Sequence, residues 1–176
     1  MGKVNITSCC MVAGINDIIN IMEKICDHKS AGMIVQKDEK ILLIERMKFP
    51  KGFACPAGHV DEFNSFEECA KEELKEEVGL DLQELNLLIE KRKENPCRRT
   101  DGTWHYWKIF SVEAQGEIER SLSETKQVGW YSKDEIRKLG NRTEEYLAGK
   151  ISEDVWNESP GLEPVWFEWF KELNII

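Results

Sequence analysis

The chain has 176 residues, of which 41% are hydrophobic and 32% are charged, and its formal net charge is −9. This length fits one ordinary domain, and no stretch approaches the ~20 apolar residues of a membrane span. An acidic surface repels nucleic-acid backbones, so we expect no broad nucleic-acid-binding surface; a phosphate substrate is compatible if a divalent cation screens the contact. Without an apolar leader at the N-terminus, we expect a cytoplasmic protein.

The spacing of apolar residues predicts mixed helices and strands along the chain. Residues 14–26 repeat apolar side chains at helical spacing. The apolar runs 31–35 and 41–44 flank a polar turn and predict a β-hairpin, and a strand follows at 53–60. The later predicted elements are strands at 85–89, 104–112 and 128–131, a basic loop at 91–102, and helices at 133–139, 143–149 and 164–173. This order favours a layered α/β domain.

The clearest predicted helix begins after Ser65, a good N-cap residue, and ends at Gly79. Glu73, Glu76 and Glu77 lie on adjoining parts of its surface, at the edge of the apolar stripe that should face the sheet. Like charges this close repel one another unless a cation lies among them. Oxygen ligands favour a hard cation, Mg²⁺ first and Mn²⁺ second. The alternative is an acid-rich helix that is merely solvated.

The segment from 58 to 80 resembles the Nudix box. That motif runs Gly, five residues, Glu, seven residues, then Arg-Glu-apolar-x-Glu-Glu-x-Gly-apolar. The positions that match at the required spacing are Gly58, Glu73, Leu74, Glu76, Glu77, Gly79 and Leu80. Two positions depart from it, because Asn64 stands where the first Glu belongs and Glu72 stands where Arg belongs. The order of the flanking elements is also Nudix-like, and the resemblance covers roughly residues 30–140.

The resemblance implies a Nudix-type α/β/α sandwich with a mixed central sheet and with N-terminal and C-terminal helical extensions. We expect a single Nudix hydrolase domain over residues 1–176, with its core at about 30–140. The expected extensions are an N-terminal one at 1–29 and a C-terminal helical tail at 141–176. The tail is rich in Trp and Phe, which we expect to pack the last helix onto the domain. A dimer face or a cover over the substrate pocket are the alternatives.

The resemblance also implies a metal-dependent hydrolase, with Mg²⁺ as cofactor and Mn²⁺ as the alternative. By position in the motif, Glu76 and Glu77 are the expected main metal ligands. Glu73 is expected to ligate a metal or to polarise the attacking water, so these three form the expected catalytic set. The carbonyl of Gly58 joins the expected metal shell, and Glu124 is the candidate for a further ligand outside the box.

The two departures from the motif leave two functions open. In the family the arginine orients the catalytic Glu, and Glu72 reverses that charge. Neither Lys71 nor Lys75 can replace it, because each projects from another side of the helix. One hypothesis is a pyrophosphohydrolase that cleaves a nucleoside diphosphate linked to another group, such as ADP-ribose, or a nucleoside triphosphate. The other is a Nudix-fold module that binds a nucleotide or a protein partner without turnover.

Candidate substrate-binding residues lie after the box. Arg98 and Arg99 could meet the distal phosphates, with a solvated basic loop as the alternative. Trp104 and Trp107 could stack on a base, although alternate aromatics on a strand are more often part of a core. The expected partner is a small-molecule nucleotide, with no membrane partner and with a homodimer as an undecided alternative. His105 has no partner that the sequence reveals.

The chain has six cysteines, which a cytosolic setting keeps reduced. Cys9, Cys10, Cys26 and His28 could be assembled into a zinc site. Their spacing, however, lacks the paired short intervals of known structural zinc sites. We therefore expect them to be small, half-buried residues of the N-terminal extension.

Overall fold

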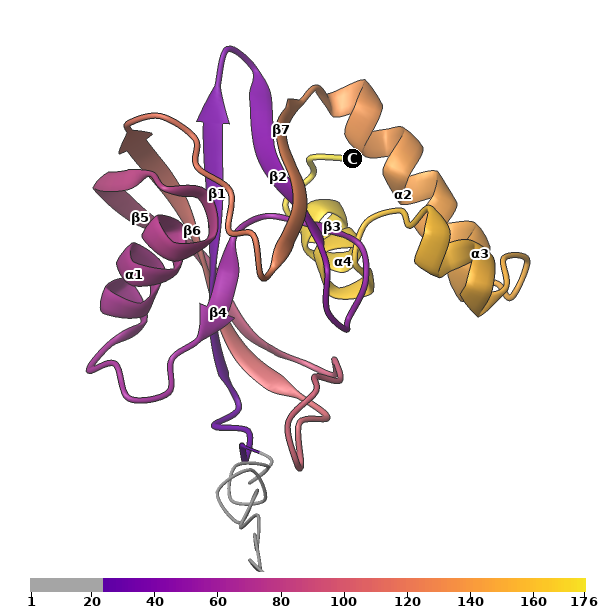
Figure 1. Cartoon of the computed structure of the whole chain (residues 1–176), viewed down its shortest axis with the longest axis horizontal. Helices are drawn as coiled ribbons and strands as arrows, with labels where there is room; N and C mark the ends of the chain where they lie inside the picture. The colour runs from indigo at the N-terminus through magenta and orange to yellow at the C-terminus, as the bar shows by residue number, and fades with distance from the viewer. Residues whose placement is uncertain (1–23) are drawn as a thin grey trace, which may run out of the picture.

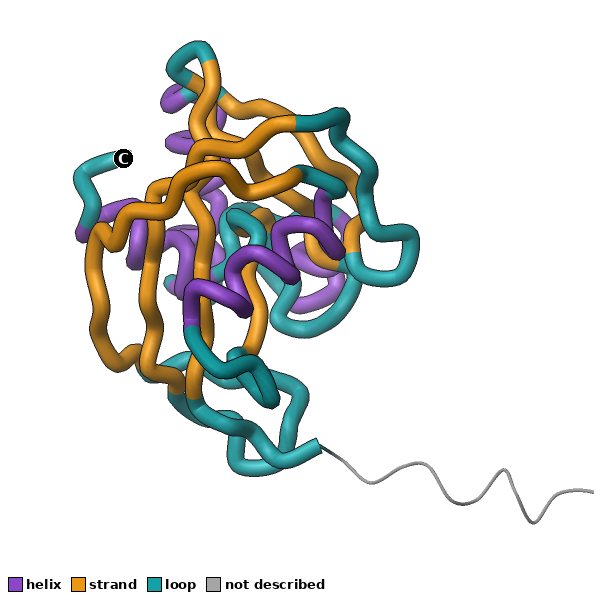
Figure 2. Tube along the Cα trace, turned by 90° about the vertical axis from the view of Figure 1, so that its left-hand side faces the viewer, coloured by secondary structure: helices purple, strands orange, loops and turns teal. Residues whose placement is uncertain are grey.

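The computed structural model describes residues 24–176, which form a seven-stranded mixed sheet with helices on both faces (Figure 1). The strands are β1 (Lys29–Lys37), β2 (Lys40–Arg46), β3 (Phe53–Ala54), β4 (Ala57–His59), β5 (Asp81–Lys93), β6 (His105–Gln115) and β7 (Thr125–Tyr131). The helices are α1 (Phe66–Val78), α2 (Lys133–Leu147), α3 (Glu153–Glu158) and α4 (Pro164–Glu172). Figure 2 shows α1 in front of the strands and the C-terminal helices behind them, so the expected sandwich is confirmed.

Strand β1 is the centre of the sheet. It pairs antiparallel with β2, as the predicted hairpin requires, and antiparallel with β4. It also pairs parallel with β6, in register from Lys29 opposite Tyr106 to Val35 opposite Val112. The residues of β1 from Ser30 to Val35 are buried on both faces, which explains their continuous run of small and apolar side chains.

The aromatic C-terminal tail packs onto the domain, as predicted. Trp166, Trp169 and Phe170 of α4 are fully buried, and both tryptophans contact Trp107 of β6 edge-on at centroid distances of 6.1 and 6.4 Å. A Cβ atom on Gly32 would lie 2.8 Å from the Trp166 ring, so glycine lets β1 pass directly beneath α4. The tail therefore closes the face of the sheet opposite α1.

Several element boundaries differ from the prediction. The strand predicted at 53–60 is two short strands, because β3 pairs with β2 whereas β4 pairs with β1. The two helices predicted at 133–139 and 143–149 form the single helix α2, in which Gly140 lies against the C-terminal tail. Helix α3 was not predicted.

The N-terminal prediction falls mostly outside the described residues. Of the helix expected at 14–26, only 24–26 are described, and there Ile25 forms an isolated β-bridge with Thr100. Cys9 and Cys10 also lie outside the described residues. In the part that the structure describes, no helix is both long and apolar enough to cross a membrane.

Candidate active site

Helix α1 brings two of the motif's carboxylates into a cavity of about 350 Å³ beside β4. Ser65 caps the helix by accepting the N–H of Glu68, and Gly79 ends it with a left-handed φ of 76°. Glu77 is 3% exposed and accepts the Ala57 N–H at 2.9 Å. Glu73 lies so close to Gly58 that a Cβ there would be 1.9 Å from its Oε1. The box glycine therefore makes room for the carboxylate.

The environment of these two carboxylates disfavours their charged forms. Burial, with repulsion from Glu76 and Glu124, raises the pKa of Glu73 to about 7. Burial also raises the pKa of Glu77 to about 8, with Glu73 adding to the effect and Arg46 opposing it. A divalent cation would remove this penalty, since it favours the ionised carboxylates. Buried oxygen donors of like charge are a donor set that fits a hard cation.

Two more predicted ligands, Glu124 and Glu76, differ in their position relative to the cavity that contains Glu73 and Glu77. Glu124 lines the same cavity and pairs with Lys48 at 2.5 Å, a contact that lowers the pKa of Glu124. Glu76 is exposed and does not line the cavity, although its charge acts on Glu73. The structure thus brings together Gly58 and three of the four carboxylates predicted as metal ligands.

Arg46, at the end of β2, is a cavity residue that the sequence analysis did not single out. Burial alone would lower its pKa, but the charges of Glu163, Glu77 and nearby carboxylates hold that pKa above the usual value. Its Nε donates to the Pro50 carbonyl at 3.0 Å and lies 3.6 Å from the buried Glu163 carboxylate. A strand therefore supplies a fixed positive charge next to the carboxylates.

The departures from the motif have plain structural consequences. Glu72, where the family has arginine, is exposed and does not line the cavity. Asn64 donates from both its backbone N–H and its side-chain Nδ2 to Glu68, each at 2.8 Å, and so closes the first turn of α1. Positive charge reaches the carboxylates through Arg46. No local pattern marked that residue, because Arg46 on β2 and Glu77 on α1 are distant in sequence and share the cavity only in the folded chain.

Both predicted phosphate-binding arginines line the cavity. Arg99 forms two hydrogen bonds with Asp61, one of them 2.8 Å long, and Lys24 forms another at 2.7 Å. Although burial opposes them, these bonds lower the pKa of Asp61 to about 2. Arg98 makes no ion pair with any other described residue. Arg98 is therefore the freer of the two guanidinium groups.

The two predicted stacking tryptophans lie elsewhere, and neither lines the carboxylate cavity. Trp107 is 5% exposed, donates its indole N–H to Asn95, and belongs to the core. Trp104 is partly exposed and stacks on the His28 ring at a centroid distance of 4.3 Å, with the Arg92 guanidinium 4.2 Å from its own ring centroid.

The family assignment follows from comparison with known proteins. A model of the NUDIX domain matches residues 27–149, which is more than half of the chain. The chain therefore belongs to the Nudix family of hydrolases. No curated protein matches the sequence as a relative.

Solved structures share the fold. A NUDIX hydrolase from Nitrosomonas europaea is 25% identical with a TM-score of 0.54, and the alignment covers 70% of this chain and 90% of that one. A MutT NUDIX hydrolase from Burkholderia pseudomallei is 23% identical with a TM-score of 0.54, covering 61% and 84%. The dihydroneopterin triphosphate pyrophosphohydrolase of E. coli is 20% identical with a TM-score of 0.54, covering 63% and 84%.

Proposed function

We propose that this Nudix hydrolase is a Mg²⁺-dependent pyrophosphohydrolase that cleaves a nucleoside diphosphate linked to another group. The substrate class is a nucleoside diphosphate sugar such as ADP-ribose, or a nucleoside triphosphate, and Mn²⁺ is the alternative cation. The observation that carries the proposal is the cavity itself. The half-buried Glu73 and the buried Glu77 line a space that arginine side chains also line, so the candidate ligands for the cation and for the phosphates share one cavity.

The division of roles follows from the positions of the side chains. Glu77 and Glu124, which line the cavity, would hold the cation together with the Gly58 carbonyl. Glu76, a ligand by its position in the motif, would have to turn in from the exposed side of α1 to join them. The chemistry supplied by a cation held there is Lewis-acid stabilisation of charge on the phosphate oxygens. Glu73, which lies in the same cavity directly beside Gly58, accepts the proton of the attacking water.

The arginines act on the phosphates. Arg46 is held in place by the Pro50 carbonyl and by Glu163, so its guanidinium is oriented before substrate binds. Arg98 is free to follow the distal phosphate, and Arg99 contributes charge from its fixed pair with Asp61. Together they orient the pyrophosphate and stabilise the charge that develops on the leaving phosphate.

An adjacent apolar cavity supports a place for the organic part of the substrate. This cavity of about 380 Å³ shares Phe49 and Pro50 with the carboxylate cavity. Tyr146 and Trp156 stack on each other at 4.1 Å in its wall. An aromatic wall suits a planar base, so we place the base there rather than at Trp107, which is part of the core.

A panel hydrolysis assay tests the proposal. The purified protein would be incubated with ADP-ribose, NADH, diadenosine polyphosphates, nucleoside triphosphates and capped RNA, with Mg²⁺ or Mn²⁺ at mildly alkaline pH. Cation-dependent turnover of one class is expected, lost in Glu77→Gln and kept in the matched control Glu72→Gln. If no substrate is cleaved while a nucleotide still binds, equally in wild type and Glu77→Gln, the chain is the binding module that Glu72 and Asn64 raise as the alternative.

A further inference from the structure

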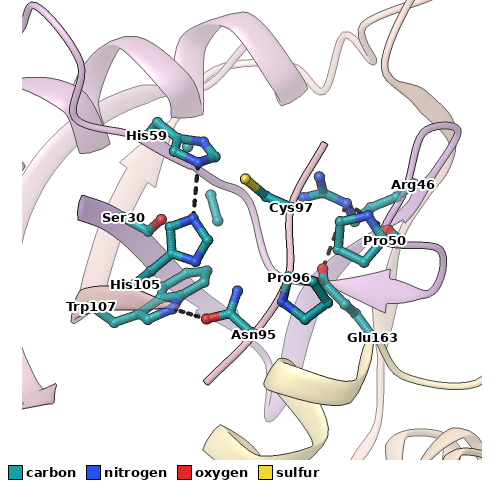
Figure 3. A pocket seen from close by; sticks show the side chains of 12 residues that line it. Ser30, Arg46, Pro50, His59, Asn95, Pro96, Cys97, His105, Trp107 and Glu163 are labelled. Carbon is teal, nitrogen blue, oxygen red and sulfur yellow. Dashed lines mark hydrogen bonds and ion pairs between the residues drawn. The ribbon is translucent and has the colours of Figure 1, made fainter. Parts of the chain in front are cut away.

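Beside the carboxylate cavity, four side chains converge that the proposed hydrolysis does not use. They are Cys26, before β1; His59, the last residue of β4; Cys97, in the loop between β5 and β6; and His105, the first residue of β6. One ligand atom from each lies within 4.8 Å of all the others. Figure 3 shows three of them, His59, Cys97 and His105, turned toward a common point beside a small cavity.

The spacing of these atoms matches a tetrahedral metal site. Bonds of ~2.3 Å to sulfur and ~2.0 Å to nitrogen place neighbouring ligands ~3.8 Å apart for two sulfurs and ~3.3 to 3.6 Å apart for the other pairs. The two sulfurs are 3.8 Å apart. His105 Nε2 lies 3.1 Å from both Cys26 Sγ and His59 Nε2. In these two pairs the atoms would need to separate by only a few tenths of an ångström, and the other three pairs lie within 4.8 Å.

Backbone N–H groups are already directed at both sulfurs. The N–H of His28 donates to Cys26 Sγ at 3.3 Å, and the N–H of Arg99 donates to Cys97 Sγ at 3.4 Å. In each case the donor is two residues after the cysteine. Burial raises the pKa of Cys26 to about 11, and the N–H of His28 acts in the opposite direction, toward the thiolate that binds a metal. Two separate loops therefore present a cysteine in the same way.

The loops that carry these cysteines are tied to each other. Cys26 N–H donates to the Thr100 carbonyl at 2.9 Å, and the Thr100 N–H donates to the Lys24 carbonyl at 3.2 Å. The loop of Cys97 closes through its N–H to the Gly102 carbonyl at 2.7 Å. A Cβ on Gly102 would lie 2.2 Å from Cys97 Sγ, so only glycine fits beside the sulfur. The group is preorganised by the backbone.

His28 is placed outside this group, although the sequence pairs it with Cys26. Its Nδ1 donates to the Trp104 carbonyl at 2.9 Å, and its ring stacks on Trp104. The partners of Cys26 are thus not the residues that its sequence neighbourhood suggested.

We propose that Cys26, His59, Cys97 and His105 bind one Zn²⁺ ion as a structural site. Two thiolates, two neutral imidazoles and Zn²⁺ have no net charge, which suits a site where Cys26 is 4% and His105 1% exposed. Sulfur and nitrogen donors in a tetrahedron favour zinc over the hard cations of the carboxylate cavity. Four protein ligands leave no position for substrate, so the site is structural rather than catalytic.

The position of this zinc site gives it a consequence for the active site. His59 directly follows Gly58, and Arg98 and Arg99 directly follow Cys97. The residues 58–59 and 97–99 all line the carboxylate cavity. One ion would therefore hold both of these segments of the cavity wall in place. The zinc site does not depend on the proposed hydrolysis, and either assignment can fail without the other.

Metal analysis of the full-length protein, purified under reducing conditions without chelator, tests the proposal. We expect about one equivalent of zinc per chain, released when a mercurial reagent blocks the thiols. Co²⁺ replacing the zinc should give the d–d bands of a tetrahedral ion and a sulfur-to-cobalt charge-transfer band. Protein that holds no zinc and gives no such spectrum with Co²⁺ would overturn the site.

Matched variants locate the ion. Cys97→Ala and His105→Ala should lower the zinc content to background. Cys55→Ala, which removes a buried thiol outside the group, should retain it, as should Glu77→Gln. Zinc retained in both Cys97→Ala and His105→Ala would overturn the assignment. Because either variant could fail to fold, the Co²⁺ spectrum of the wild type decides independently.

An intramolecular disulfide is the competing account of the two cysteines. The Cys26 and Cys97 sulfurs would have to move from 3.8 Å to bonding distance, which would leave the two imidazole nitrogens facing each other. Mass spectrometry after alkylation separates the accounts. A disulfide in freshly purified, unreduced protein that holds no zinc would refute the zinc site, whereas thiols protected from alkylation until zinc is removed would support it.

Discussion

The carboxylate cavity and the cysteine–histidine group lie side by side, meeting at Gly58 and His59, yet their chemistry is opposite. The first presents oxygen atoms of like charge, Glu73 and Glu77 among them, around a space of about 350 Å³. The second brings sulfur and nitrogen atoms within 4.8 Å of one another, beside a cavity of only about 50 Å³. Two sets of candidate ligands, one hard and one soft, thus meet at adjacent residues of β4.

The difference shows that the type of ligand and the space around the ion decide whether a site is suited to catalysis or to holding the structure together. A hard cation among carboxylates keeps water and phosphate in its shell, so the volume around it is available for reaction. A soft-ligand site with four protein donors is saturated and can only hold segments together. Arg46 offsets part of the repulsion in the carboxylate cavity, and a bound cation would offset more of it. In the cysteine–histidine group, backbone N–H groups are directed at both sulfurs without an ion.

The largest expected effect comes from removing a charge in the carboxylate cavity. Glu77→Gln keeps the size of the side chain but loses a buried carboxylate, so kcat should fall by about 10³-fold. Steady-state kinetics with a saturating divalent cation measures this, with Glu72→Gln as the control on the exposed part of α1. A kcat within a factor of about three of wild type would remove Glu77 from the catalytic machinery.

Arg46→Gln should lower kcat by about 10²-fold, because it removes an oriented donor to the phosphates. It also leaves Glu163 buried without its ionic partner, so the thermal midpoint should fall as well. Arg46→Lys keeps the charge and separates the two effects, restoring stability more than rate. Arg137→Gln, which alters an exposed arginine paired with Asp134, is the control. Equal rates for Arg46→Gln and this control would show that the cavity works without Arg46.

Withdrawing zinc should affect stability more than chemistry. Loss of a structural ion should lower the thermal midpoint by roughly 10 °C in a chain of this size. At temperatures where the protein stays folded, turnover should fall by less than about tenfold, since the ion touches no reacting atom. Calorimetry before and after thiol-directed release of zinc, with Mg²⁺ constant, measures the first quantity. An unchanged thermal midpoint would mean that an ion bound by the cysteine–histidine group does not stabilise the folded protein.

The smallest effect is expected where the sequence departs most visibly from the family motif. Glu72→Arg restores the motif but changes an exposed residue outside the cavity, where solvent screens its charge. Turnover should change by less than about threefold. A gain of tenfold or more in kcat/KM would show that position 72 still acts on Glu73, and that Arg46 does not take over that role.

The sequence pattern was sufficient to predict those elements whose stabilising interactions join residues close together in the chain. The helix from Phe66 to Val78 could be predicted because its N-cap, its apolar period and its terminal glycine are all adjacent in sequence. The same holds for the hairpin of β1 and β2 and for the carboxylates of the box. Element ends were less predictable. Gly140 suggests a break in α2, yet tertiary contacts with the tail keep the helix continuous.

The sequence by itself therefore determined the family, the layered fold and the helix that carries Glu73 and Glu77, because each depends on a short, regular spacing. Only the tertiary structure decided which distant residues meet. Arg46 reaches the carboxylates from a strand, and Cys26 meets His105 across 79 positions of the chain. No periodicity encodes such encounters. The second one arises from the pairing of β1 with β6 and from the closure of the loop between β5 and β6.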